Sequence, residues 1–215
     1  MDIINEYKKF CEERYILLSI QSSVTPYNET TLFCPAGIQQ FKHLFSHIDY
    51  RGTIANIQAC IRMNDFDEIG DFSHLLYFNM IGLFSFREML IEDAITFWVN
   101  FLKRIGIKPD YVTIHSNRHY WLKYYHLIGI NDVRFDDENC KWSDGDIEGY
   151  CTEFFLNNVE IGNIVNPFDQ FIDAGFGLER LEMFVNGKTI NKIDTLKETA
   201  IKMIESGYTP SNLKQ

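Results

Sequence analysis

The feature that most constrains the fold is the order in which β-prone segments follow one another. Residues 54–62 and 75–86 form one pair of such segments, and residues 151–173 contain another, with no helical pattern inside either pair. Parallel strands need long crossover connections, which are usually helices, whereas antiparallel strands can follow each other directly. The order therefore predicts antiparallel hairpins in a sheet covered by helices. This is an α/β protein of the α+β type rather than a doubly wound parallel sheet.

Three segments have the apolar spacing of amphipathic helices. They lie at residues 3–11, at residues 90–105 before Gly106, and at residues 193–204 before Gly207. Glycine is the usual residue just beyond a helix end, which fixes the last two boundaries. We find no internal repeat and no linker, and 215 residues are enough to bury one core, so we expect a single domain.

The charge and the cysteines exclude several classes of protein. The net charge of −10 argues against a broad nucleic-acid surface, which needs clustered lysine and arginine. The five cysteines form no Cys-x-x-Cys pair, which indicates free thiols in a reducing compartment. Asp2, Glu6 and Lys8 interrupt any apolar leader, and no segment is apolar for long enough to cross a membrane. We expect a soluble cytoplasmic protein.

Residues 173–180 have the composition of a nucleotide-contacting segment. Asp173 is followed by the glycine pair Gly175 and Gly177, and Arg180 comes one turn into a predicted helix. Glycine lets a backbone approach a ligand closely, and the planar arginine fork matches phosphate oxygens. A strand-to-helix turn without any ligand has the same pattern, so the interpretation depends on the rest of the chain.

Six blocks, in order, resemble the catalytic domain of alanyl-tRNA synthetases, from about residue 3 to residue 186. The blocks are residues 26–42, 58–65, 74–86, 142–153, 160–165 and 173–180. The resemblance implies an ATP-dependent, amino-acid-activating class II synthetase fold, with six to seven antiparallel strands flanked by helices. It also implies that the whole chain, residues 1–215, is one catalytic domain, without the family's tRNA-recognition, editing and C-terminal domains.

The resemblance assigns the ATP site. Its positions correspond to Arg62, His74, Phe78, Glu153, Gly177 and Arg180. Arg62 would contact the α-phosphate and the amino-acid carboxylate, and Arg180 would close the other side of the nucleotide, so these two are the predicted catalytic residues. His74 would reach the γ-phosphate and Phe78 would stack on adenine, since both point to one face of a strand. Glu153 is the predicted Mg²⁺ ligand, because Mg²⁺ takes carboxylate and phosphate oxygens.

The resemblance also assigns an amino-acid pocket. Asp173 would pair with the substrate ammonium, and Asn163 would support it. Trp142 and Val165 would enclose the side chain, and Gly175 would admit the backbone. An indole across the pocket leaves room for little more than a methyl group, so alanine is the first choice, followed by glycine or serine.

Simpler interpretations exist for individual residues. Trp142 alone is compatible with a core aromatic, Asp173 with a helix cap, and Arg62 with a strand-end ion pair. Two histidine pairs with a spacing of four, at residues 43–47 and 115–119, are interpreted as surface histidines rather than zinc ligands. The functional interpretation rests on all these residues occurring together in the family's order.

Three departures from the family bear on function. Only Met63 separates Arg62 from residue 64, where the family has a longer glycine- and lysine-containing loop that reaches toward tRNA. Asn79 replaces a glutamate, and Gly162 replaces a tryptophan. With the clipped loop and the missing recognition domains, tRNA is not expected as a substrate without a partner.

These features lead us to expect an enzyme that activates a small amino acid with ATP and Mg²⁺ and transfers it to a carrier-protein thiol or a small-molecule amine. A carrier would need a local basic patch, for which the candidates are Lys103, Arg104, Lys108, Arg118 and Lys123. The alternatives are a non-catalytic paralogue that acts as a regulatory or partner subunit, and a tRNA-charging enzyme whose recognition domain is a separate chain. The sequence leaves the oligomeric state open, a homodimer included.

Overall fold

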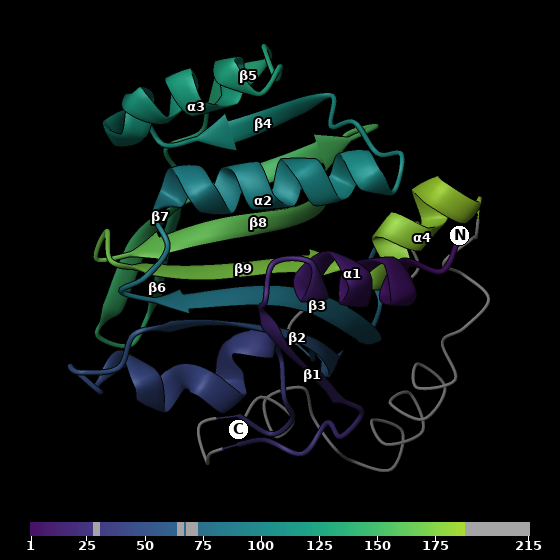
Figure 1. Cartoon of the computed structure of the whole chain (residues 1–215), viewed down its shortest axis with the longest axis vertical. Coiled ribbons are helices and arrows are strands. Elements are labelled where there is room, and N and C mark those ends of the chain that lie inside the picture. Colours follow the sequence, from purple (N-terminus) through teal and green to yellow (C-terminus); the bar gives the residue numbers. More distant parts are fainter. Residues whose placement is uncertain (28–30, 64–66, 68–72, 188–215) are drawn as a thin grey trace.

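A mixed β-sheet forms the centre of the structure (Figure 1). The computed structural model describes residues 1–27, 31–63, 67 and 73–187, and the predicted helix at residues 193–204 and the motif residues 28–29 and 64–65 fall outside them. In the described part the sheet has nine strands in the order β1-β2-β3-β9-β8-β7-β4-β5, and β6 pairs with β7. The strands are β1 (Leu17–Gln21), β2 (Gly52–Ile61), β3 (Tyr77–Phe86), β4 (Tyr111–Ile114), β5 (Val133–Phe135), β6 (Lys141–Asp144), β7 (Ile147–Leu156), β8 (Val159–Pro167) and β9 (Phe171–Gly177).

Helices connect and cover these strands. They are α1 (Ile3–Glu12), α2 (Ile91–Arg104), α3 (Leu122–Leu127), α4 (Leu178–Asn186) and the 3-10 helices η1 (Gly37–Phe45) and η3 (Ser116–Trp121). The first two agree with the predicted helices. None of the helices in the described ranges combines the length and apolarity that crossing a membrane requires.

The predicted antiparallel hairpins are confirmed. Strands β2, β3, β9, β8, β7 and β4 form a six-stranded antiparallel core. The predicted segment at residues 151–165 is split into β7 and β8 by a turn at Asn157 and Asn158, whose φ angles of 50° and 61° suit a tight hairpin. The sheet has more strands than the resemblance implied, because β1 and β5 add parallel pairs at its two edges. Long connections with helical turns precede both pairings, and such connections permit parallel strands.

Alternation along the strands gives the sheet two different faces. Ala55, Ile57, Ile81 and Leu83 belong to the buried core formed with α1 and α2, which lie across one face (Figure 1). The intervening residues of β3 point the other way because side chains alternate along a strand. The opposite face of the sheet therefore carries a different set of side chains, and an element other than α1 and α2 packs on it.

Among the described residues, η1 covers one end of the sheet on that opposite face. Ile38 of η1 packs with Phe84, Phe86 and Phe171 in a separate apolar cluster, with Phe45 against it. The remainder of this face is lined by Phe78, Met80, Gly82 and their neighbours on β9 and β8. This uncovered part of the face holds the cavity described below.

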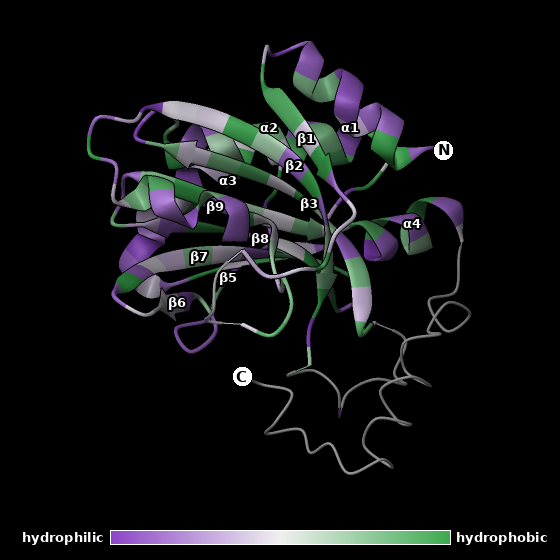
Figure 2. Cartoon of the chain, turned by 90° about the horizontal axis from the view of Figure 1, so that it is seen from below, coloured by the Kyte–Doolittle hydropathy of each residue, from purple (hydrophilic) through white to green (hydrophobic). Residues whose placement is uncertain are grey.

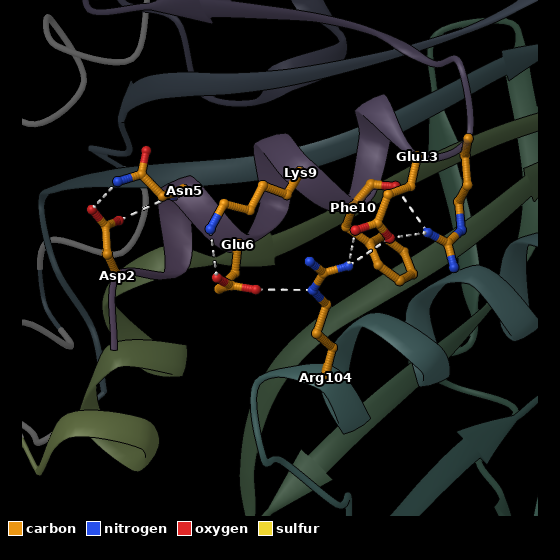
Figure 3. Close-up of polar contacts among 8 residues, drawn as sticks. Asp2, Asn5, Glu6, Lys9, Phe10, Glu13 and Arg104 are labelled. Atoms are coloured by element: carbon orange, nitrogen blue, oxygen red, sulfur yellow. Dashed lines mark hydrogen bonds and ion pairs between the residues drawn. The ribbon is translucent and has the colours of Figure 1, made fainter.

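Arg104 at the end of α2 joins the two long helices. Its Nε donates to Glu6 Oε2 at 2.9 Å and its Nη1 to Glu13 Oε2 at 2.7 Å (Figure 3). The guanidinium also lies 5.7 Å from the centre of the Phe10 ring. The Arg104 hydrogen bond lowers the pKa of Glu6, as expected for a paired carboxylate. Arg104 is therefore engaged within the fold, and it is not the unpaired basic side chain that a docking patch for a carrier would need.

Candidate functional site

The uncovered face of the sheet holds a cavity of about 360 Å³. Ten of the eleven predicted site residues line it, although they come from segments spread over more than a hundred positions. These residues are Arg62, His74, Phe78, Trp142, Asn163, Val165, Asp173, Gly175, Gly177 and Arg180. The structure thus brings the two halves of the predicted site together in one place.

Strand register explains how these residues meet. Gly175 of β9 lies opposite Gly82 on one side and Asn163 on the other. Asp173 lies opposite Val165 of β8, so both face the cavity. The strand β9 therefore places Asp173 at one end of the cavity and Gly177, followed by Arg180, at the other. We call these the acid end and the arginine end.

Arg62 is held at the arginine end by its neighbours. It directly follows β2, and its backbone N–H donates to the carbonyl of Leu76 at 3.1 Å. Its side-chain Nε donates to the carbonyl of Pro35 at 3.0 Å. The guanidinium lies 5.2 Å from the centre of the Phe78 ring, within range of a cation–π contact. These contacts fix a positive group and an aromatic ring side by side.

Arg180 in the first turn of α4 spans the same end from the other side. Its Nε donates to the carbonyl of Ser73 at 3.1 Å, and its Nη1 to the carbonyl of Glu160 at 2.6 Å. The Glu160 carboxylate is also 3.6 Å from Nη1. Arg180 thereby links α4, β8 and the segment that leads to His74. Arg62 and Arg180 thus bring two guanidinium groups to this end of the cavity, where the carboxylates of Glu160 and Glu179 also lie.

Glu179, next to Arg180, also lines the cavity and is bound by Asn79. Its carboxylate accepts hydrogen bonds from the Asn79 backbone at 2.9 and 3.0 Å and from the Asn79 amide Nδ2 at 2.9 Å. Burial raises the pKa of Glu179 even though these hydrogen bonds favour the charged form. At position 79, where the resembling family usually has a glutamate, this chain presents an amide donor instead of a second carboxylate.

The acid end is enclosed by a small apolar cluster. Trp142 of β6 packs against Val165, Cys140 and Cys151. The pairing of β6 with β7 positions the indole, since Trp142 lies opposite Gly149 in that hairpin. In the described chain the five cysteines are free and buried. The half-buried Asp173 carboxyl thus shares this end with an indole and a valine.

The two predicted glycines differ in their steric role. A Cβ on Gly175 would lie 2.6 Å from the sulfur of Met80, so no larger residue fits there unless Met80 moves. A Cβ on Gly177 would meet only the Arg180 side chain, at 3.6 Å or more. A larger residue at position 175 would therefore displace the flexible Met80 side chain in the cavity wall, whereas one at position 177 would displace nothing.

Glu153 is the predicted residue that does not line the cavity in the described structure. It lies on β7 opposite Asn163, and its carboxylate accepts a hydrogen bond from Thr113 Oγ1 at 3.2 Å. Burial and the negative charge of Glu160 raise its pKa to about 7. Glu160, which does line the cavity, was not singled out from the sequence although it begins one of the six motif blocks. Glu179, which also lines the cavity, was not singled out either, although it directly precedes Arg180 in the block at residues 173–180.

The histidine prediction is partly wrong. His119 is exposed as expected, but His115 is buried at the end of β4. Its Nδ1 accepts a hydrogen bond from the Asn117 N–H at 3.0 Å and caps η3, and its ring packs edge-on against Tyr150. Within the described residues no group of three metal-binding side chains is found.

The raised pKa of Glu153 predicts a pH dependence of stability in the absence of divalent metal. The folded protein binds the Glu153 proton more tightly than the unfolded chain, whose carboxyl titrates near 4.5. The stabilisation is therefore complete below about pH 4.5 and is lost as the pH rises through about 7. Between these pH values the free energy of unfolding should fall by on the order of 1 kcal/mol, a figure that allows for the partial solvent access of Glu153. We expect this fall to be absent in Glu153→Gln.

Urea unfolding at pH 5 and pH 8 measures this difference. Glu12→Gln is the matched control, because it makes the same chemical change at an exposed position on α1. If Glu153→Gln and Glu12→Gln shift the two free energies of unfolding alike, the proposed environment of Glu153 is wrong.

Comparisons with known proteins agree with the geometry. The profile of the family described as tRNA synthetases class II (A) matches residues 2–208. An alanine–tRNA ligase of Chlamydia caviae is 28% identical over 242 residues, covering 90% of this chain and 28% of the relative. One of Helicobacter pylori is 28% identical over 244 residues, covering 91% and 28%. This chain thus spans less than a third of these relatives, and the aligned regions exceed its 215 residues, so the relatives carry insertions.

Solved structures support the fold. A pyrrolysyl-tRNA synthetase of Desulfitobacterium hafniense, PylSc, superposes with a TM-score of 0.54 at 16% identity, covering 87% of this chain and 69% of that one. A second structure of pyrrolysyl-tRNA synthetase from this organism gives a TM-score of 0.55 at 15% identity, with the same coverage. The sheet, the ordered motifs and the profile match lead to one conclusion: the chain belongs to the class II (A) tRNA synthetase family.

Proposed function

We propose that the chain activates a small amino acid, with alanine as first choice, by forming an aminoacyl-adenylate from ATP. Membership of the class II synthetase family implies amino-acid activation in general. The observation that carries the proposal is that one cavity has two arginines at one end and both Asp173 and Trp142 at the other. Such an arrangement suits a reaction that brings a carboxylate next to a triphosphate.

The proposed reaction is an attack of the amino-acid carboxylate oxygen on the α-phosphorus of ATP. A new oxygen–phosphorus bond forms while the bond to the β-phosphate oxygen breaks, and pyrophosphate leaves. Positioning and neutralisation of charge supply most of the catalysis in such reactions. Arg62 would hold the α-phosphate and the carboxylate, and Arg180 would neutralise the phosphates from the α4 side. His74 would reach the γ-phosphate, and Phe78 would stack on adenine beside Arg62.

At the acid end, Asp173 would bind the substrate ammonium with help from Asn163. Trp142 and Val165 would limit the substrate side chain, since both pack in the same apolar cluster. The relatives named alanine–tRNA ligases support alanine as first choice. Gly175 would let the amino-acid backbone approach the cavity wall. The Met80 side chain lies next to this glycine.

Mg²⁺ fits the carboxylates at the β7–β8 side of the cavity. Glu160 lies in the cavity wall, and its charge contributes to the raised pKa of Glu153, which lies on β7 opposite Asn163. A cation near these carboxylates would offset the effect of the Glu160 charge on Glu153, and Mg²⁺ prefers carboxylate oxygen ligands. Glu160, whose carboxylate lies 3.6 Å from Arg180 Nη1, would hold the ion, and Glu153 would contribute its negative charge from β7. Bound there, Mg²⁺ would shield the phosphates and assist the departure of pyrophosphate.

For the acceptor we propose a non-tRNA group, either a carrier-protein thiol or a small-molecule amine. The net charge of −10 and the single residue Met63 in the clipped loop support this choice over tRNA. The structure gives a carrier little basic surface, because Arg104 is paired with α1 and Arg118 donates to Asp169 at 2.8 Å. The relatives are named alanine–tRNA ligases, which supports tRNA as the alternative acceptor. In that hypothesis the recognition domain is a separate chain. A non-catalytic role as a partner subunit remains the third hypothesis.

Pyrophosphate exchange tests the proposal. We expect the purified chain to exchange label between pyrophosphate and ATP in the presence of L-alanine, and less with glycine or serine. Arg62→Ala should abolish exchange, whereas Arg134→Ala, at an exposed ion pair with Asp132, should leave it unchanged. Labelled amino acid offered to bulk tRNA and to holo-carrier proteins then identifies the acceptor.

Two outcomes of this experiment would contradict the proposal. An absence of exchange with every amino acid, in a preparation shown to be folded, favours the non-catalytic subunit. Label that appears on tRNA without any added protein overturns the choice of a non-tRNA acceptor while leaving the activation step intact.

A further inference from the structure

The strand β3 extends beyond the end of β9 at the arginine end of the cavity. The last residue of β9, Gly177, lies opposite Met80, so Asn79 has no partner in β9. The helix α4 begins directly after Gly177 and lies beside this end of the sheet, in contact with β3 (Figure 1 and Figure 2). A backbone N–H that a neighbouring strand does not pair needs another acceptor, because an unpaired buried group is costly.

Glu179 in the first turn of α4 supplies this acceptor. Both of its carboxylate oxygens accept the Asn79 backbone N–H, at 3.0 and 2.9 Å, and Oε1 also accepts the Asn79 amide Nδ2 at 2.9 Å. We call these contacts the Asn79–Glu179 clamp. Phe78 directly precedes one member of the clamp, and Arg180 directly follows the other. The clamp therefore connects two residues of the predicted ATP site that come from different elements.

The clamp also determines where the negative charge of Glu179 lies. Glu179 lines the arginine end together with Arg62 and Arg180, and a carboxylate that paired with either guanidinium would compete with a phosphate for it. In the described residues the Glu179 oxygens are bonded to Asn79, and the ion pair of Arg180 is with Glu160. A glutamate at position 79, as the resembling family usually has, would instead place a second negative charge against Glu179.

We propose that Asn79 is a positioning residue for ATP. Through Glu179 it fixes Phe78, which would stack on adenine, relative to Arg180, which would neutralise the phosphates. It also prevents the Glu179 carboxylate from turning toward the arginines. Asn79 would act through these neighbours and not by touching the nucleotide, since it does not line the cavity in the described structure. The inference rests on the proposed function and adds to it a requirement for an amide at position 79.

Four proteins test this role: the unaltered chain, Asn79→Asp, Glu179→Gln and the double variant with both changes. Asn79→Asp keeps the shape of the side chain and places two carboxylates against each other. Near pH 6 the pair can share a proton and stay closed, whereas near pH 8 both carboxylates are ionised and repel each other. We expect the Kd for ATP to rise ~10- to 100-fold at pH 8, the factor that corresponds to losing a hydrogen bond to a charged group, and to rise less at pH 6.

The double variant exchanges the amide and the carboxylate between the two positions. Its clamp can close again, so its Kd for ATP should return close to that of the unaltered chain at both pH values. Glu179→Gln alone leaves two amides, which can still form a hydrogen bond, so its effect should be small and independent of pH. A structural role without any link to ATP predicts no such pH profile.

Isothermal titration calorimetry with ATP and Mg²⁺ measures the Kd, and each value is divided by that of the unaltered chain at the same pH. Asn5→Asp is the matched control, because Asn5 binds the Asp2 carboxylate in the same way. Its backbone N–H donates to Oδ1 at 3.0 Å and its amide to Oδ2 at 2.6 Å, at the start of α1 (Figure 3). This control should leave the Kd for ATP unchanged at both pH values.

Urea unfolding of the four proteins without ATP measures the contribution of the clamp to the fold separately. If Asn79→Asp lowers the stability but leaves the Kd for ATP unchanged at both pH values, Asn79 has a structural role only and the proposal is wrong. A double variant that binds ATP as weakly as Asn79→Asp would also overturn it, because the amide–carboxylate pair would then not be the cause. An unaltered chain that does not bind ATP would contradict the proposed function itself, and this inference with it.

Asn79→Ala is a second variant for the case that Asn79→Asp does not fold. It removes the amide without adding a charge, so it should weaken ATP binding to the same extent at both pH values. An unchanged Kd in Asn79→Ala would overturn the proposal.

Discussion

Replacing Asp173 by asparagine is expected to raise the alanine concentration needed for half-maximal pyrophosphate exchange by ~30- to 5000-fold. This range corresponds to the ~2–5 kcal/mol that follows the loss of one partner from a desolvated charge pair. Asparagine keeps the shape of the side chain, so the contacts of β9 with Val165 and Phe84 are retained. What is lost is the negative charge that would balance the substrate ammonium. Binding of ATP, measured by equilibrium titration, should change little because the arginine end is untouched.

The reverse pattern is expected for Arg180→Ala. This change removes a cation from the arginine end and also frees the carbonyl groups of Ser73 and Glu160. ATP binding should weaken strongly, while the dependence on alanine at saturating ATP is less affected. Asp132→Asn serves as the control, since Asp132 is exposed and paired with Arg134 at the sheet edge. Equal losses of ATP binding in the Asp173 and Arg180 variants would show that the two ends of the cavity have been assigned wrongly.

The antiparallel core could be predicted because its signals are local. The β-prone composition of residues 75–86 and the lack of a helical connection between the paired segments are visible in the sequence alone. The parallel edge pairs could not be predicted in this way. Leu17–Gln21 is short, and its partner Gly52–Ile61 is distant, so the pairing depends on the path of the intervening η1 segment.

The candidate site shows the same division. Asp173 and Gly175 could be placed on one face of a strand from their spacing of two, and the resemblance assigned Asn163 to the same pocket. The position of Glu160 could not, because the register of β7 and β8 shifts between Phe154 and Phe155. Such a bulge re-aims the side chains beyond it and leaves no clear signal in the sequence. Glu160 lies in the cavity wall, while the predicted Glu153 is hydrogen-bonded to Thr113 and does not line the cavity.

The second large effect concerns stability and the position at which this chain has Gly162. Gly162 lies opposite Phe176 of β9, and a Cβ on this glycine would come within 2.3 Å of the Phe176 ring and 2.7 Å of the Gly175 carbonyl oxygen. Phe176 is itself stacked on Trp98 of α2, with 4.1 Å between ring centres. The aromatic side chain that fills this space therefore comes from β9, whereas the resembling family usually has a tryptophan on β8.

The close contact between position 162 and the Phe176 ring predicts a strong coupling between the effects of substitutions at these two positions on stability. Phe176→Ala should lower the free energy of unfolding by ~3–5 kcal/mol, the usual cost of removing a buried aromatic ring. Gly162→Ala alone should cost ~1–3 kcal/mol, because the added methyl group overpacks the contact with the ring. In the double variant the methyl group enters the space that the ring has left, and only the contact with the Gly175 carbonyl resists it. The double variant should therefore be more stable than the sum of the single effects by more than ~0.5 kcal/mol.

Urea unfolding of the four proteins gives this coupling energy directly. Gly177→Ala is the matched control for adding a methyl group to a glycine of this sheet, because its new Cβ would meet only the Arg180 side chain, at 3.6 Å. It should lower the stability by less than Gly162→Ala does. Additive effects of Gly162→Ala and Phe176→Ala would mean that the methyl group is excluded by the backbone of β9 rather than by the ring. In that case Phe176 would not be the residue that requires a glycine at position 162. The presence of Phe176 on β9 would then not explain why this chain lacks the family's tryptophan on β8.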